Sequence, residues 1–195
     1  MIYLNYTNMK MKIRIWFYPL ILMGFVLIFT NGCKKNTDKP IAVSDADGNA
    51  YHSVTIGTQE WLVENLKTTK YNDGTAIPLI TSNSGWANLT TPGYCFYDND
   101  AGINKATYGA LYNWYTVNTG KLCPTGWHVP SDIDWTTLTN NLGGENVAGG
   151  KLKQSGISLW SSPNDGANNS SGFTALPAGY RQEAGSFANI NDDDF

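Results

Sequence analysis

The sequence has few of the residues from which metal sites and many catalytic sites are built. It contains only 2 histidines and 3 cysteines, and charged residues make up 15% of the chain. Neither His52 nor His128 has a cysteine or carboxylate at the spacing of metal ligands, so we expect no metal site. The GxSxG pattern of many serine hydrolases is also absent. We therefore expect a protein without cofactor, metal or catalytic residues.

Basic residues are also scarce. The chain has 13 lysines and arginines against 16 aspartates and glutamates. Lys10, Lys12 and Arg14 lie in a leader that we expect to be removed, which leaves 10 basic residues against the same 16 acidic ones. A nucleic-acid-binding domain needs a basic surface. The charge balance therefore argues against nucleic acid as a partner.

An apolar run follows these basic residues and ends shortly before a cysteine. The run covers residues 15–29, and Cys33 follows a glycine four residues later. This order is that of a secretory signal peptide, and 15 residues are too few for a spanning helix, which needs about 20. We expect residues 1–32 to be a signal peptide whose true start is Met9 or Met11.

Cys33 stands where bacterial lipoproteins carry the cysteine that is lipidated and becomes the new N-terminus. Residues 30–32 resemble a lipobox only loosely, since a leucine is usual three residues before the cysteine. The alternative is a free cysteine beyond an ordinary cleavage site. With lipidation, residues 33–42 form a tether from a palmitate-bearing anchor to the domain. Lys34 is not the aspartate that retains lipoproteins in the inner membrane, so we expect a cell-envelope protein in the outer membrane.

Two cysteines, Cys95 and Cys123, remain in the exported part. In an oxidising compartment such a pair more often bonds than stays free. The 27 residues between them exclude a CxxC redox motif and a zinc ribbon. We therefore regard the two as disulfide candidates.

After the leader, the composition favours short strands and many turns, being rich in glycine, asparagine, threonine, tyrosine and tryptophan. Apolar alternation over residues 51–56 and a turn at 57–58 predict a hairpin. Residues 91–100 predict an aromatic strand, and the apolar spacing within 108–117 predicts a helix. The order of elements predicts an α+β fold.

The densest stretch of the sequence is CPTGWHVPSDIDWTTLTNNLGG, residues 123–144. Ser131 and Asp134 form a capping-box pattern at a helix start. Trp135 and two leucines then recur on one helical face, and two glycines end the helix. Because no nucleophile stands beside a base, we interpret the stretch as a structural nucleus with Trp135 buried.

The tryptophans fall into two groups. Those on apolar stripes are predicted to be structural core: Trp61, Trp114, Trp127 and Trp135. Trp86 and Trp160 instead lie in polar loops, beside asparagine and aspartate. A sugar-stacking site would use tryptophans in such loops, so the two are ligand-binding candidates. The alternative is that each of them pins its loop to the core.

Two acidic patterns suggest chemistry but have simpler explanations. Residues 45–49 resemble the start of a calcium loop, yet Ile56 occupies the position where such a loop needs glutamate. A solvated Asp-Gly turn explains this pattern better. Asp132 and Asp134 could suggest paired catalytic carboxylates. Both fall in the first turn of a predicted helix, where acids are favoured in any case.

Six blocks of the chain resemble, in order, the Fibrobacter succinogenes major paralogous domain. The blocks are DADGNAYHSVTIGTQEWLVENLKTTKYNDGTAIP, GYCFYDND, YGALYNWYTV, CPTGWHVPSDIDWTTL, AGGKLK and SGFTALPAGYR. The resemblance implies an exported protein of a family rich in lipoproteins, largely from Bacteroidetes and Fibrobacteres. It also implies a C-type-lectin-like fold similar to that of formylglycine-generating enzymes, in which a Pro-Ser pair and a later tryptophan begin a helix, as Pro130 and Trp135 do here.

The resemblance also implies an early end. Family members usually continue with a tryptophan-rich strand and then a strand carrying a cysteine, the expected partner of Cys123. We therefore expect the domain, residues 43–195, to be incomplete at its C-terminus. In that case the strand around Val54 lacks a partner, and a version extended by the missing strand should be more stable.

Two function hypotheses remain. The first is a lipid-anchored envelope protein with a non-enzymatic binding or adhesion module for a glycan or a surface protein. The alternative is a structural or vestigial envelope protein, a truncated paralogue without a ligand. The enzymes of the superfamily place their catalytic residues in regions that this chain lacks or does not match, so fold analogy carries no enzymatic role across.

Overall fold

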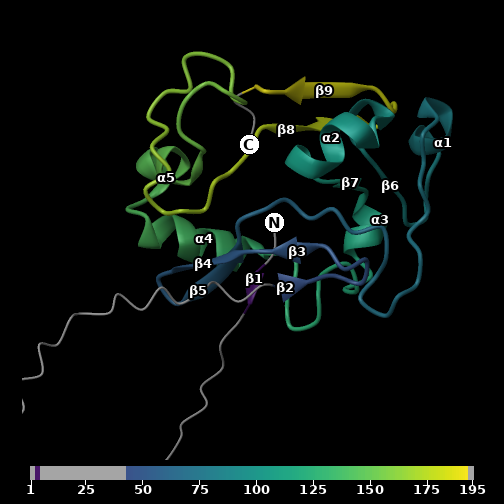
Figure 1. Ribbon diagram of the computed structural model, residues 1–195, viewed down its shortest axis with the longest axis horizontal. Coiled ribbons are helices and arrows are strands. Elements are labelled where there is room, and N and C mark those ends of the chain that lie inside the picture. Colours follow the sequence, from purple (N-terminus) through teal and green to yellow (C-terminus); the bar gives the residue numbers. More distant parts are fainter. Residues whose placement is uncertain (1–2, 5–42, 193–195) are drawn as a thin grey trace, which may run out of the picture. The chain divides into compact units, whose positions relative to one another are not determined.

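The computed structural model describes residues 3–4 and 43–192 of the chain (Figure 1). Cys33, the tether and all but two residues of the predicted signal peptide lie outside the described residues, so these stay predictions. Within the described part, none of the helices has the length and apolar character needed to cross a membrane.

Short antiparallel strand pairs alternate with short helices, which confirms an α+β fold. The strands are β1 (Tyr3–Leu4), β2 (Val43–Ser44), β3 (Ala50–Tyr51), β4 (Ser53–Ile56), β5 (Gln59–Leu62), β6 (Tyr94–Cys95), β7 (Leu111–Tyr112), β8 (Ala178–Arg181) and β9 (Phe187–Ile190). The helices are α1 (Asn83–Ala87), α2 (Ala101–Tyr108), α3 (Trp114–Val117), α4 (Asp132–Asn141) and α5 (Glu145–Leu152), with a 3-10 turn, η1, at Tyr97–Asn99.

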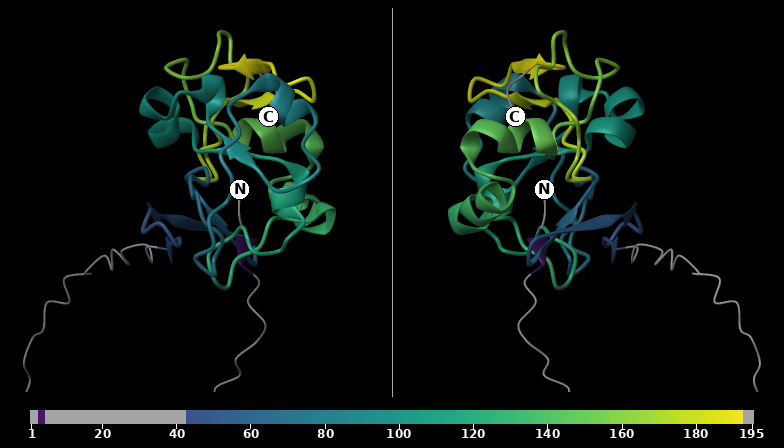
Figure 2. Two further views of the ribbon diagram at one scale, coloured as in Figure 1. Left: turned by 90° about the vertical axis from the view of Figure 1, so that its right-hand side faces the viewer. Right: turned by 90° about the vertical axis from the view of Figure 1, so that its left-hand side faces the viewer.

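The predicted hairpin is confirmed as β4–β5. Ile56 lies opposite Gln59, and Gly57 takes a positive φ of 62° in the two-residue loop between them. β1 pairs antiparallel with the other edge of β5, which gives the order β1-β5-β4 (Figure 1). β4 is therefore an outer strand of this sheet. The β8–β9 hairpin lies at the end of the domain away from it, as Figures 1 and 2 show.

The predicted helix over residues 108–117 is wrong for residues 109–113, and its last four residues form a separate short helix, α3. α2 ends at Tyr108, where Gly109 takes a positive φ of 73°. β7 follows and pairs with β6, with Tyr112 opposite Tyr94. The side chain of Asn113 then caps α3 by accepting a hydrogen bond from the amide of Thr116. Pairing with β6, which is distant in sequence, thus outweighs the helical spacing of the apolar residues.

The core consists of two clusters of buried side chains. The first contains Tyr51, Leu62, Leu66, Tyr71, Ile77, Tyr94, Phe96, Leu122 and Cys123. The second contains Ile56, Trp61, Leu138, Leu142, Ala148, Leu152, Phe173 and Ala175. β5 contributes to both, because successive residues of a strand point to opposite faces. Trp61 therefore enters the second cluster while Leu62 enters the first.

A buried arginine ties the loop around α1 to the β8–β9 hairpin. Arg181 donates hydrogen bonds from Nη1 to the Ile80 carbonyl (2.7 Å) and from Nε to the Gly185 carbonyl (2.8 Å). Its guanidinium carbon lies 4.7 Å from the ring centroids of both Trp86 and Phe187. The planar cation therefore lies against both aromatic rings while its edge is bonded to backbone.

We expect Arg181→Lys to lower the free energy of unfolding by about 2–3 kcal/mol, because lysine keeps the charge but loses the planar stacking and the forked hydrogen bonds. Urea denaturation measures the change. Lys121→Arg at an exposed ion pair is the control and should shift the free energy by less than about 0.5 kcal/mol. Equal effects of the two substitutions would contradict the role given to Arg181.

Candidate functional site

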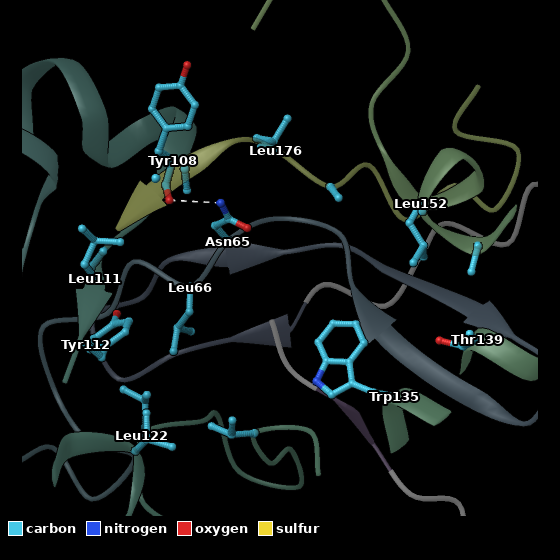
Figure 3. A pocket seen from close by; sticks show the side chains of 18 of the residues that line it. Asn65, Leu66, Tyr108, Leu111, Tyr112, Leu122, Trp135, Thr139, Leu152 and Leu176 are labelled. Carbon is cyan, nitrogen blue, oxygen red and sulfur yellow. Dashed lines mark hydrogen bonds between the residues drawn. The ribbon is translucent and has the colours of Figure 1, made fainter. Parts of the chain in front are cut away.

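A cavity of about 780 Å³ is lined by residues of both core clusters. Leu66 and Leu122 of the first cluster line it, as do Ala148, Leu152 and Ala175 of the second. Figure 3 shows Leu66, Tyr112 and Leu122 on one side of the space, with Trp135 and Leu152 on the other. Most of the lining side chains are aliphatic or aromatic, and they come from segments between residues 65 and 179.

The volume of this cavity lies within the range of small-molecule sites. Protein interiors leave few voids larger than one water molecule. Small-molecule pockets instead span about 300–1,000 Å³ and are mostly apolar, with a few polar groups. The polar groups here include the side chains of Asn65, Thr139 and Glu145. The cavity can therefore accept several apolar side chains or a small apolar ligand.

A smaller hollow of about 300 Å³ adjoins the cavity beside α4. The two share Trp135, Thr139 and Glu145 as lining residues, and the hollow adds Asp132 and Asn140. These side chains make the hollow polar and acidic, in contrast to the apolar cavity. Trp135 therefore lines both the apolar cavity and the polar hollow.

The capping box that begins α4 is confirmed and positions Trp135. The Ser131 hydroxyl accepts a hydrogen bond from the Asp134 amide (3.4 Å), and the Asp134 carboxylate accepts one from the Ser131 amide (2.9 Å). The Trp135 ring centroid lies 5.0 Å from that of Trp61 and 6.4 Å from that of Phe173. The predicted burial of Trp135 holds only in part: its ring packs on the second cluster, but the residue is half-buried at the cavity wall.

The carboxylate of Asp134 is engaged in structure. Its Oδ2 also lies 3.3 Å from Nε2 of His128. Burial raises the pKa of Asp134, but the hydrogen bonds from Ser131 and the contact with His128 outweigh burial and hold the pKa below its usual value. Asp132, the other acid of the predicted pair, is exposed in the first turn of α4. The two acids therefore lie in the first turn of α4, where acidic residues stabilise a helix, and this is the simpler of the two explanations for the pattern.

The structure contradicts the prediction for Trp114 and gives Trp160 the structural role that was the alternative. Trp160, a ligand-binding candidate, is only 2% exposed, and its Nε1 donates a hydrogen bond to the Ala175 carbonyl (3.2 Å). The Lys153 ammonium lies 4.6 Å from its ring centroid, so Trp160 pins its loop to the core. Trp114, a predicted core residue, is 68% exposed. α3 is only four residues long, and Thr116 is its buried residue.

The remaining tryptophans keep closer to expectation. Trp61 is fully buried, as predicted. Trp127 is half-buried and packs against the first cluster. Trp86, the other ligand-binding candidate, is half-buried and lies against the guanidinium of Arg181. This contact anchors the loop of Trp86, so the ring takes the structural role that was the alternative.

Cys95 and Cys123, the two disulfide candidates, are both buried, and no disulfide joins them in this structure. Cys123 packs in the first cluster. Burial raises the pKa of the Cys95 thiol, although a contact with Arg181 opposes the shift. Burial raises the pKa of Cys123 to about 12. Thiols with raised pKa values are poor nucleophiles.

The carboxylates of the acidic turn at residues 45–49 are engaged by hydrogen bonds and an ion pair within the protein. Asp45 Oδ1 accepts hydrogen bonds from the amides of Asp47 and Asn49, both at 2.9 Å. The Asp47 carboxylate accepts the Thr69 amide and lies 3.2 Å from the Lys70 ammonium. Among residues 43–192, no group of three or more histidines, cysteines and acids is arranged to hold a metal ion.

A profile of the Fibrobacter succinogenes major domain matches residues 54–195. The chain belongs to this family. No curated protein and no solved structure matches the chain. All residues that line the cavity fall within the matched range, so the cavity is a feature of the Fibrobacter succinogenes major domain of this protein.

Sequence analysis missed the cavity because its walls form no local motif. Leu66, Leu111 and Leu176 come from three distant segments, and each reads as an ordinary core residue. The available signal was the presence of small side chains, such as Ala148 and Ala175, where larger apolar residues would have filled the space between the clusters. Their neighbours across the cavity are known only from the tertiary structure.

We expect Trp135→Ala to lower the free energy of unfolding by about 3 kcal/mol, because it removes the ring that packs on Trp61 and enlarges the cavity. Thermal or urea denaturation measures the loss. Trp114→Ala is the matched control, since its ring is exposed, and it should change the free energy by less than about 0.5 kcal/mol. Equal losses of stability from the two substitutions would mean that the Trp135 ring does not pack on the core at the wall of the cavity.

Proposed function

We propose that the protein is an exported, lipid-anchored envelope protein whose domain acts as a binding module. The cavity of about 780 Å³ is the observation that carries this proposal. Its apolar walls supply affinity by removing apolar ligand surface from water, at about 25 cal/mol per Å². The polar hollow beside α4 supplies groups that orient a ligand at the entrance.

Binding, and not catalysis, is the role we propose for this site. The cavity is lined mostly by leucine, valine, alanine and aromatic side chains, and none of the described residues that line it is a cysteine, serine, lysine or histidine. Asp134, beside the cavity, is held in the capping box, and both thiols have raised pKa values. We also propose that the fold belongs to the C-type-lectin-like class. The helix start at Ser131 with Trp135 in its first turns supports that assignment.

Membrane attachment through Cys33 is part of the proposal. The apolar run at residues 15–29 and the position of Cys33 support export and lipidation. A lipid anchor with a polar tether would hold the domain at the cell envelope, in the outer membrane. The ligand would then be a glycan or a protein segment of the envelope.

We expect Cys33→Ser to move the protein from the membrane fraction to the soluble fraction, because it removes the acceptor of the lipid. Fractionation of cells after palmitate labelling measures this. Lys34→Ala, next to the acceptor, is the control and should still be labelled and membrane-bound. An unlabelled wild-type protein, or a Cys33→Ser variant that remains in the membrane fraction, contradicts the anchor.

We expect Leu176→Trp to abolish ligand binding while the domain stays folded, because the larger ring occupies the cavity that Leu176 lines. Arrays of envelope glycans and of extended peptides measure binding. Ile157→Trp adds the same ring at a site that is 63% exposed and outside the lining, and should bind as wild type does. The proposal fails if no arrayed compound binds, or if the two variants lose binding equally.

A further inference from the structure

We propose that the ligand of the cavity is an extended segment of polypeptide that pairs with the outer edge of β5. The segment adds a strand to the sheet and directs apolar side chains toward the cavity. This inference rests on the proposed binding function and names its ligand class. Three observations support it: the direction of the backbone groups of β5, the pairing of β1 with this edge, and the apolar lining of the cavity.

The backbone groups of β5 alternate between its two edges. In an antiparallel pair, residues that exchange hydrogen bonds alternate with residues that do not. The residues that flank a two-residue loop, here Ile56 and Gln59, form a hydrogen-bonded pair. At the other end of the hairpin the Val63 amide donates a hydrogen bond to the His52 carbonyl (3.0 Å), which fits the same alternation of bonded and non-bonded pairs. Glu60, which lies between these pairs, therefore directs its N–H and C=O away from β4.

The structure shows that this edge accepts a strand. β1 lies antiparallel to β5, with Tyr3 opposite Trp61 and Leu4 opposite Glu60. These two residues precede the start that we expect at Met9 or Met11, and they lie in the segment 1–32 that we expect to be absent from the exported protein. The exported protein would then present the β5 edge without a partner, and an unpaired edge is a template for another strand. β5 itself is a core strand, since Gln59, Trp61 and Leu62 are buried.

The edge leads to the cavity. Trp61 of β5 packs against Trp135, which lines the cavity. Further along the chain from β5, Leu66 also lines the cavity. A strand in the register of β1 runs toward Leu66 at its own N-terminal end, because the pairing is antiparallel.

The chemistry of the walls favours a polypeptide over a glycan. A few points of the lining are polar, but Leu66, Leu122 and Leu152 offer no hydrogen-bond partner from their side chains. Sugar hydroxyl groups placed among them would lose hydrogen bonds to water without replacement, which is costly. An extended peptide instead pairs its backbone with β5 and buries alternate apolar side chains. Strand addition of this kind takes affinity from the backbone and specificity from side-chain pockets.

The test uses the processed protein, extracted from membranes, and a fluorescent peptide of sequence MIYLNYTN, which carries residues 1–8. Fluorescence anisotropy measures binding. In the register of β1, the backbone N–H of Leu4 faces Glu60, whereas that of Tyr3 points away from β5. We expect N-methylation at Leu4 to weaken binding about tenfold or more, and N-methylation at Tyr3, the matched control, to change it by less than about threefold.

Four results would overturn the inference. Equal weakening by the two N-methyl groups means that the peptide binds without strand pairing. Dimers of the protein that the peptide does not dissociate mean that a second copy occupies the edge. Glycan binding that Leu176→Trp abolishes, without peptide binding, rejects the polypeptide ligand but leaves the proposed function intact. Absence of both glycan and peptide binding rejects the inference and the proposed function together.

Discussion

The packing of Trp61 against Trp135 and Phe173 is the contact on which the rest of the domain depends. Trp61 is fully buried, and its ring centroid lies 5.0 Å from that of Trp135 and 5.7 Å from that of Phe173. These contacts join β5 to α4 and to the segment before β8. Aromatic rings at such separations contribute about 0.5–1.5 kcal/mol per pair beyond the burial of their area. Leu62, the next residue of β5, faces the other cluster, so one strand supports both halves of the core.

The same arrangement explains why the core is divided. α4 is held by its capping box and by the hydrogen bond from Gln59 Nε2 to the Asp134 carbonyl (3.0 Å). It therefore covers Trp61 from one side, while Leu66 and Leu122 line the cavity from the first cluster. The cavity lies where these two groups of side chains do not meet. In our proposal a strand along β5 completes both the sheet and the core, which makes recognition an extension of the fold itself.

Local patterns in the sequence predicted the parts of the fold that depend on few residues. The capping box at Ser131 and the β4–β5 hairpin were predicted because each is specified within a few neighbouring positions. The helix over 108–117 was wrong at residues 109–113 because β6 offers a pairing partner that periodicity does not reveal. Trp114 is exposed and Trp160 is buried because the burial of each ring is decided by tertiary contacts and not by its neighbours in sequence. The cavity could not be foreseen, because its walls come from distant segments.

An accessible apolar space lies between the two core clusters. A crystal structure of the processed protein under xenon pressure tests this most directly, because xenon binds in apolar cavities of sufficient size. Our account predicts xenon among Leu66, Leu122 and Leu152, and predicts that Leu176→Trp reduces its occupancy. Direct packing of Leu122 against Leu152, without xenon between them, would contradict it.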